Sequence, residues 1–177
     1  MQGIKAFIPT AQKVQYLQSL LRVGFDTIDF GSFVSPKAIP QMADTAEVLS
    51  QLDLSSTQSK LLAIVANSRG ALDAASHKEI DFLGYPFSIS ENFQMRNTHK
   101  TIAQSIDTLR EILEIARANN KQVVVYISMA FGNPYGDPWN VEIVAKWTER
   151  LNAMGVEILS LSDTIGSSTP KSISYLF

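Results

Sequence analysis

Apolar residues gather into short runs along the chain, and segments with helical spacing separate these runs. The clearest run covers residues 122–129, where Val123, Val124 and Val125 follow one another. A continuous run of β-branched residues indicates a strand buried on both faces. On this basis we expect five strands, at residues 25–30, 61–66, 80–87, 122–129 and 158–162.

Between the runs, apolar residues recur every three or four positions, as is typical of amphipathic helices. Thr10 should begin the first helix, and Gly24 should follow its end. Residues 1–9 and 88–97 are expected to be loops. Further helices are predicted from Pro40, over 71–75, from Thr98 to Asn119, from Asp137–Pro138 to Gly155, and from Thr169–Pro170 onward.

Helices and strands therefore alternate along the chain, an order that demands parallel strands with right-handed crossovers. An open doubly wound sheet and a (β/α)₈ TIM barrel both satisfy this order. The absence of G-x-G-x-x-G after any strand and of a phosphate-loop lysine motif weakens the nucleotide-binding sheet. Polar residues at several strand ends favour a barrel, which takes eight strands and about 250 residues. We therefore predict an α/β fold of about five parallel strands, with residues 1–177 forming a single partial barrel domain.

Composition narrows the possible partners. The chain is 45% hydrophobic and 18% charged with a formal net charge of -2, so no nucleic acid partner is expected. The absence of cysteine excludes disulfides and thiolate metal sites. No apolar run reaches the roughly 20 residues that span a membrane, so no membrane partner is expected. The first residues also lack the apolar core of a signal peptide, and a cytoplasmic location is expected.

Polar side chains near the strand ends are the candidates for chemistry. Because side chains alternate along a strand, Asp29 shares a face with Thr27, and Asp163 shares one with Leu161. Two carboxylates, a phenol and a hydroxyl would suit cation binding or proton transfer, although an aspartate at a strand end also commonly caps the next loop. If these faces point into one barrel, four residues meet at its mouth: Asp29, Tyr126, Ser128 and Asp163.

Three contiguous motifs lie along the chain. Residues 32–44 contain Ser-Phe-Val-Ser-Pro-Lys and then Pro-Gln-Met-Ala-Asp, and they resemble the loop after the second strand of the hydroxymethylglutaryl-CoA lyase family. Residues 126–135 resemble its fifth-strand segment, and residues 162–170, with Ser-Asp-Thr-Ile-Gly and Thr-Pro, resemble its sixth-strand motif. The resemblance is collinear from the loop after the family's first strand to the start of its sixth helix.

The resemblance implies a metal-assisted cleavage of a carbon–carbon bond. A 3-hydroxy-3-methylglutaryl-CoA-like thioester would give acetyl-CoA and a keto acid, with Mg²⁺ or Mn²⁺ as the implied cofactor of the full-length family and an acyl-CoA thioester as the partner. The matching motif positions imply catalytic roles for Asp29, Asp163 and Tyr126. They imply substrate-binding roles for Ser32, Ser128 and Thr164.

The chain also departs from the family. Asp29 replaces a glutamate that is one methylene longer, and Val124 replaces an arginine. None of the family's direct metal ligands falls within the matching segments. We therefore expect this chain, as a fragment, to bind divalent metal weakly or not at all and to lack lyase activity alone.

Two other functions stay open. A non-catalytic half-barrel could assemble with another chain, or with its own copy, through the two open edges of the sheet. A synthase of the same superfamily would instead condense acetyl-CoA with a keto acid. The Phe33–Lys37 stretch favours the lyase over the synthase.

Overall fold

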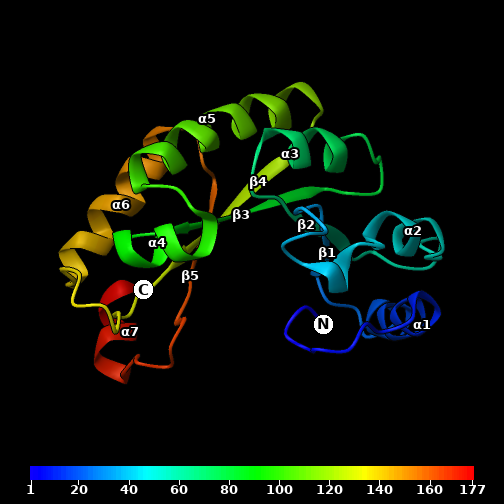
Figure 1. Ribbon diagram of the computed structural model, residues 1–177, viewed down its shortest axis with the longest axis horizontal. Coiled ribbons are helices and arrows are strands. Elements are labelled where there is room, and N and C mark those ends of the chain that lie inside the picture. The colour runs from blue at the N-terminus through cyan, green and yellow to red at the C-terminus, as the bar shows by residue number, and fades with distance from the viewer.

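Five parallel strands form one sheet in chain order, which confirms the predicted alternation. The computed structural model describes residues 1–177 (Figure 1). Each strand pairs in parallel with the next one along the chain, as in part of a (β/α)₈ barrel. The strands are β1 (Thr27–Ser32), β2 (Lys60–Ile64), β3 (Phe82–Ser88), β4 (Gln122–Ser128) and β5 (Ile158–Leu161).

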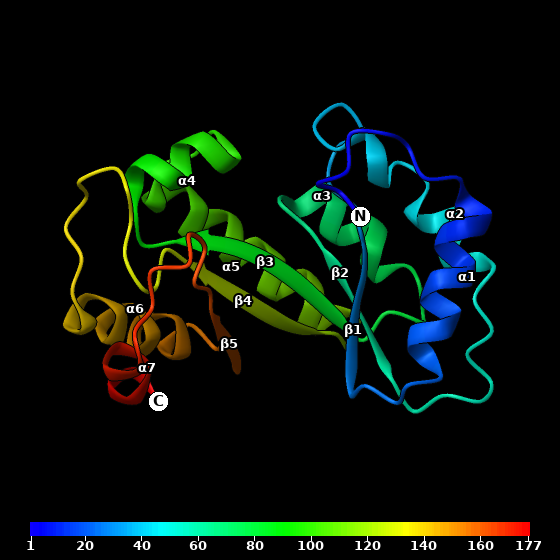
Figure 2. The same ribbon diagram turned by 90° about the horizontal axis from the view of Figure 1, so that it is seen from below.

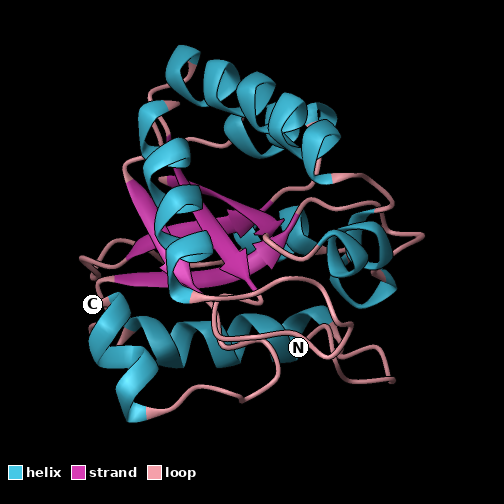
Figure 3. Cartoon of the chain, turned by 90° about the vertical axis from the view of Figure 1, so that its left-hand side faces the viewer, coloured by secondary structure: helices cyan, strands magenta, loops and turns pink.

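The helices surround the strands on the outside (Figure 3). Figure 2 shows α1 and α2 beside β1 and β2, α5 running along β3 and β4, and α6 and α7 near β5. No helix is both long and apolar enough to cross a membrane. The helices are α1 (Thr10–Leu21), the 3₁₀ helix η1 (Pro40–Met42), α2 (Thr45–Ser50), α3 (Ser68–Ala75), α4 (Glu91–Thr98), α5 (Ile102–Ala118), α6 (Val141–Ala153) and α7 (Pro170–Leu176).

The two faces of the sheet differ in what covers them. The outer face packs against the helices and supplies a core of 30 buried residues, including Leu83, Val125 and Ile127. The inner face carries a much smaller apolar cluster, which contains Leu62, Phe82, Val124, Ile64 and Tyr126. Alternating side chains therefore separate a helix-covered core from a concave inner surface that is free to hold a ligand.

Residues 88–97, predicted to be a loop, instead contain α4. The hydroxyl of Ser90 accepts a hydrogen bond from the N–H of Phe93, which is an N-cap that hydrophobic spacing does not reveal. Thr98 was predicted to begin the long helix, but it ends α4. Thr101 caps α5 instead and forms a capping box with Gln104.

Other helix boundaries also differ from prediction. Asn140, not Asp137, caps α6 by accepting a hydrogen bond from the N–H of Ile143. The Asp137 carboxylate accepts hydrogen bonds from Ser90 and Asn92, so it joins the loop after β4 to the first turn of α4. The helix predicted from Pro40 is divided into η1 and α2.

One buried ion pair joins α1 to the residue that precedes α2. The ammonium group of Lys13, only 1% exposed, donates to Asp44 Oδ1 and to the carbonyl oxygen of Gln41, both at 2.5 Å. The hydroxyl of Thr10 donates to Asp44 Oδ2 at 2.7 Å, so it binds another element rather than capping its own helix. Burial alone would raise the pKa of Asp44, but the hydrogen bonds from Lys13 and Thr10 and the Lys13 charge outweigh it and hold the pKa below its usual value.

Removal of one partner of this pair should destabilise the chain strongly. We expect Lys13→Met to lower the free energy of unfolding by about 3 kcal/mol at pH 7, because it leaves a buried carboxylate without its cation. The double variant Lys13→Met/Asp44→Leu should recover most of that loss. The measurement is urea unfolding followed by circular dichroism.

The exposed pair Arg110–Asp107 provides the matched control. Arg110→Met should cost less than about 1 kcal/mol, because solvent screens an exposed pair. The Asp44 pKa is lowered, so its contribution should be present above pH 4 and fade as the pH falls further. If Lys13→Met and Arg110→Met lower the free energy of unfolding equally, the buried pair does not stabilise the chain more than the exposed one.

Candidate functional site

An irregularity in β1 decides which of its side chains face inward. Asp29 pairs with Leu62 and Ser32 pairs with Ile64, while the register skips Phe30. Leu62 and Ile64 belong to the inner apolar cluster, so Asp29 and Ser32 lie on the inner face together. Residues 29 and 32 are three positions apart, so simple alternation would place their side chains on opposite faces of the sheet. The bulge shifts the alternation by one residue and brings both side chains to the inner face.

The chain after the bulge is held in place by Thr45 of α2. The N–H of Ser32 donates to Thr45 Oγ1 at 3.2 Å, and the Thr45 hydroxyl donates to the carbonyl oxygen of Met42 at 2.8 Å. Gly31 allows this approach, because a Cβ at Gly31 would lie only 2.5 Å from Thr45 Cγ2. The Ser32 hydroxyl accepts a hydrogen bond from the N–H of Val34 at 3.2 Å, which fixes its direction.

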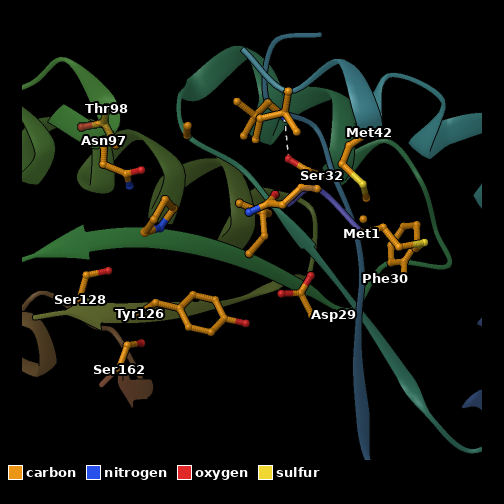
Figure 4. Close-up of a pocket in the computed structure, with 17 residues that line it drawn as sticks. Met1, Asp29, Phe30, Ser32, Met42, Asn97, Thr98, Tyr126, Ser128 and Ser162 are labelled. Carbon is orange, nitrogen blue, oxygen red and sulfur yellow. Dashed lines mark hydrogen bonds between the residues drawn. The ribbon is translucent and has the colours of Figure 1, made fainter. Parts of the chain in front are cut away.

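A cavity of about 510 Å³ lies on the concave inner face (Figure 4). Asp29 is the only charged side chain in its lining, and most of the other polar groups are hydroxyls and amides. The polar side chains come from β1, the end of α4, β4 and the residue after β5. They are Asp29, Ser32, Asn97, Thr98, Tyr126, Ser128 and Ser162, with Gln2 at the edge.

The Asp29 carboxylate has an altered proton affinity. Asp29 is exposed to the solvent of the cavity by its surface area, but atoms of the concave wall surround it, and this partial desolvation raises the pKa of Asp29 to about 6. The hydroxyl of Tyr126 and the amino terminus near the cavity act in the opposite direction. At neutral pH the group is therefore ionised, yet it takes up a proton far more readily than an ordinary carboxylate.

Tyr126 points its phenol toward Asp29 from β4 (Figure 4). Burial, and then the negative charge of Asp29, raise the pKa of Tyr126 to about 12. The phenol therefore keeps its proton over the whole physiological range and is available to donate a hydrogen bond. A carboxylate that titrates near neutrality beside a neutral phenol is an arrangement suited to proton transfer.

The structure does not bring Asp163 into this cavity. The register pairs Tyr126 with Ser160 and Ile127 with Leu161, so Ser160 lies on the inner face and Leu161 on the outer one. The expectation that the face of β5 with Leu161 and Asp163 points into the barrel is therefore wrong, whereas the role that the family resemblance implies for Asp163 stays a prediction. Ser162, which follows Ser160 on the inner face, lines the cavity in place of Asp163.

Asp163 organises the loop after β5 instead. Its carboxylate accepts hydrogen bonds from the N–H groups of Ser167 at 2.8 Å and Ser168 at 3.0 Å. Hydrogen bonds from Ser168, and then from Ser167 and Gly166, hold the pKa of Asp163 below its usual value. Thr164 accepts a hydrogen bond from the N–H of Met129 at 2.8 Å and likewise does not line the cavity.

Three residues that line the cavity were not predicted from the sequence: Asn97, Thr98 and Ser162. Asn97 and Thr98 reach the cavity because α4 exists where a loop was expected. The Ser90 N-cap was the available signal for that helix. For Ser162, the available signal was that serines alternate with Leu159 and Leu161, which indicates one polar and one apolar face of β5. Which of these faces points inward depends on the register with β4.

The cavity residues do not by themselves fit a magnesium or manganese site. Such cations take about six oxygen ligands, usually with more than one carboxylate or with substrate oxygens. Asp29 is the single carboxylate in the lining, and the chain holds no group of three or more His, Cys, Asp or Glu side chains placed around a common point. The expectation of weak or absent metal binding stays a prediction.

Together, the curled parallel sheet and the polar cavity on its inner face define part of a TIM-barrel protein of the class that keeps its chemistry toward the carboxyl ends of the strands. The HMGL-like family model matches residues 1–177. The chain belongs to the HMGL-like family.

Relatives of known activity agree with this assignment. The chain is 36% identical over 172 residues to the mitochondrial hydroxymethylglutaryl-CoA lyase of Bos taurus, covering 96% of this chain and 52% of the relative. The crystal structure of the HMG-CoA lyase from Brucella melitensis superposes with a TM-score of 0.91 at 34% identity, over 99% of this chain and 61% of that one. This chain thus spans about half the length of the curated relatives it matches.

A third similar structure is an HMG-CoA lyase from Acinetobacter baumannii in complex with coenzyme A and 3-methylmalate. It has a TM-score of 0.91 and 28% identity, and the match covers 99% of this chain and 56% of that one. These matches confirm the predicted family resemblance and the partial barrel.

The interaction between Asp29 and Tyr126 can be measured by titration. In Tyr126→Phe we expect the Asp29 pKa to rise above its value of about 6, because the phenol that lowers it is gone. Carboxyl ¹³C chemical shifts followed against pH give this pKa directly. Since the folded pKa exceeds the ordinary value of 3.8, the contribution of Asp29 to stability should fall as the pH rises from about 4 to 6.

Tyr135→Phe is the matched control, since this tyrosine lies against Phe93 and Arg96 and outside the cavity. It should leave the Asp29 titration unchanged. An Asp29 pKa near 4 in the unaltered chain would show that the cavity does not dehydrate the carboxylate.

Proposed function

We propose that this chain forms part of a carbon–carbon lyase of the hydroxymethylglutaryl-CoA type. The substrate would be a 3-hydroxy-3-methylglutaryl-CoA-like thioester, and the products would be acetyl-CoA and a keto acid. One observation carries the proposal. In the cavity of a barrel of this family, the phenol of Tyr126 is directed toward Asp29, a carboxyl group whose pKa of about 6 lies close to neutral pH.

Asp29 is the proposed proton acceptor. Ionised at pH 7, it takes the proton of the substrate's tertiary hydroxyl, and the oxygen electrons form the new carbonyl as the carbon–carbon bond breaks. The electron pair of the broken bond goes to the departing acetyl-CoA carbon, which then takes up a proton. A base whose pKa lies just below the working pH is both ionised and able to return its proton.

Tyr126, Ser32 and Ser128 have supporting roles in this proposal. The protonated phenol donates a hydrogen bond either to Asp29 or to a substrate oxygen, and the two serine hydroxyls face the same space. Mg²⁺ or Mn²⁺, implied by the family, has no complete ligand set among these residues, so each role is assigned to this chain's own side chains. The coenzyme A bound to the Acinetobacter baumannii lyase supports an acyl-CoA as the partner.

A segment exchange tests the proposal. Residues 1–177 would replace the matched segment of the Brucella melitensis lyase, and acetoacetate release from hydroxymethylglutaryl-CoA would be followed with Mg²⁺ or Mn²⁺ present. We expect turnover by the chimera and none by the isolated chain. Asp29→Asn in the chimera should lower kcat by about 10²–10⁴-fold, the usual contribution of a positioned base.

The control variant is Asp107→Asn, an exposed α5 position paired only with Arg110, which should leave kcat unchanged. If the chimera folds but does not turn over, NMR shifts of Tyr126 and Ser128 in the isolated chain on addition of the thioester give a second readout. A folded, inactive chimera together with no cavity shifts would overturn the proposed function. Turnover by the isolated chain would contradict only the predicted inactivity of the fragment.

A half-barrel that assembles with another chain is the second candidate. β1 pairs only with β2 and β5 only with β4, so each has a free edge, and Ile158 of β5 is 37% exposed. Free parallel edges invite further strand pairing. Under this proposal, sedimentation velocity should show mass rising with concentration, whereas a stable monomer at high concentration would contradict it.

A further inference from the structure

Gly84 lies at the centre of the inner face of β3. It pairs with Ile64 of β2 and with Val124 of β4, both of which belong to the inner apolar cluster. Its φ angle lies outside the left-handed region, so the backbone conformation is open to any residue. What restricts the residue at this position is therefore the space for a side chain on the inner face of the strand, and not the backbone conformation.

Neighbouring side chains fill that space. A Cβ at Gly84 would lie 2.7 Å from Leu62 Cδ2, 2.8 Å from Ile64 Cδ1 and 3.1 Å from Tyr126 Cε2. The two aliphatic contacts are with the tips of flexible side chains, which can rotate away. The third contact is with a rigid ring, which can only move as a whole.

The Tyr126 ring extends from β4 toward β1, although these two strands are not neighbours in the sheet. β2 and β3 lie between β1 and β4, and at about 4.8 Å per strand the two outer backbones lie roughly 14 Å apart along the sheet. A tyrosine on β4 approaches a carboxylate on β1 only where the sheet curls and the ring lies low across β3. Figure 4 shows the phenol of Tyr126 directed along this path toward Asp29.

We propose that Gly84 is a positioning residue, whose missing side chain leaves the space in which the Tyr126 ring lies directed toward Asp29. The consequence for catalysis rests on the proposed lyase function, whereas the pairing of the two side chains does not.

A plain packing role is the alternative, and the two roles differ in their effect on titration. If Gly84 acts through Tyr126, Gly84→Ala displaces the ring. The Asp29 pKa then rises, by no more than in Tyr126→Phe, and the Tyr126 pKa falls from about 12 as the ring moves away from the nearby charge. If Gly84 only accommodates Leu62 and Ile64, stability falls and neither titration changes.

The experiment measures the Asp29 titration by carboxyl ¹³C NMR and the Tyr126 titration by tyrosinate absorbance, in the isolated chain. Four forms are compared: the unaltered chain, Gly84→Ala, Tyr126→Phe, and the double variant. The proposal requires that Gly84→Ala has no further effect on the Asp29 pKa once Tyr126→Phe is present. Additive shifts, or an unchanged Asp29 pKa in folded Gly84→Ala, would overturn it.

Two further variants keep the test decisive. Gly3→Ala adds a methyl group where nothing lies within 4 Å and should change neither titration. If Gly84→Ala does not fold, Gly84→Ala/Ile64→Val removes the clashing Cδ1 atom while leaving the contact with Tyr126. Because these readouts need no substrate, a failed proposal here is separable from a failed lyase proposal, which the chimera tests by turnover.

Discussion

The parallel register of the five strands determines which side chains can meet inside the chain. Each strand presents alternate residues to the helices and to the concave face, so one shift of register would exchange core and cavity. The bulge in β1 is the one place where this alternation is broken. By skipping Phe30 it sends Asp29 and Ser32 inward together, and Gly31 lets Thr45 of α2 approach and hold the chain after the bulge.

The cavity that results has an unusual charge distribution. It holds one carboxylate and no cationic side chain, so nothing nearby compensates for the lost hydration of Asp29 except the Tyr126 phenol and the amino terminus. This imbalance keeps the pKa of Asp29 near neutrality. Burial, together with the same negative charge, raises the pKa of Tyr126, so a carboxylate that titrates near neutrality lies beside a phenol that keeps its proton.

Buried polar contacts connect the cavity rim to the scaffold. Gln94, 1% exposed, accepts a hydrogen bond from the N–H of Ser88 at the end of β3 and donates one to the hydroxyl of Thr98 at 2.6 Å. Lys13 and Asp44 join α1 to the segment that carries Met42 on the opposite rim. Each rim is thus held by a satisfied buried polar group, which places the site on rigid elements.

The sequence alone determined the alternation of helices and strands, the parallel sheet and the family, and it singled out four residues that the structure places in one cavity: Asp29, Ser32, Tyr126 and Ser128. These depend on local patterns: apolar runs, turn residues and contiguous motifs. Only the tertiary structure decided that Ser162 rather than Asp163 lines the cavity, because the inward face of β5 is set by its pairing with β4. The close surroundings of Gly84 likewise become visible only when three neighbouring strands are in place, since the space above a glycine is defined by side chains distant in sequence.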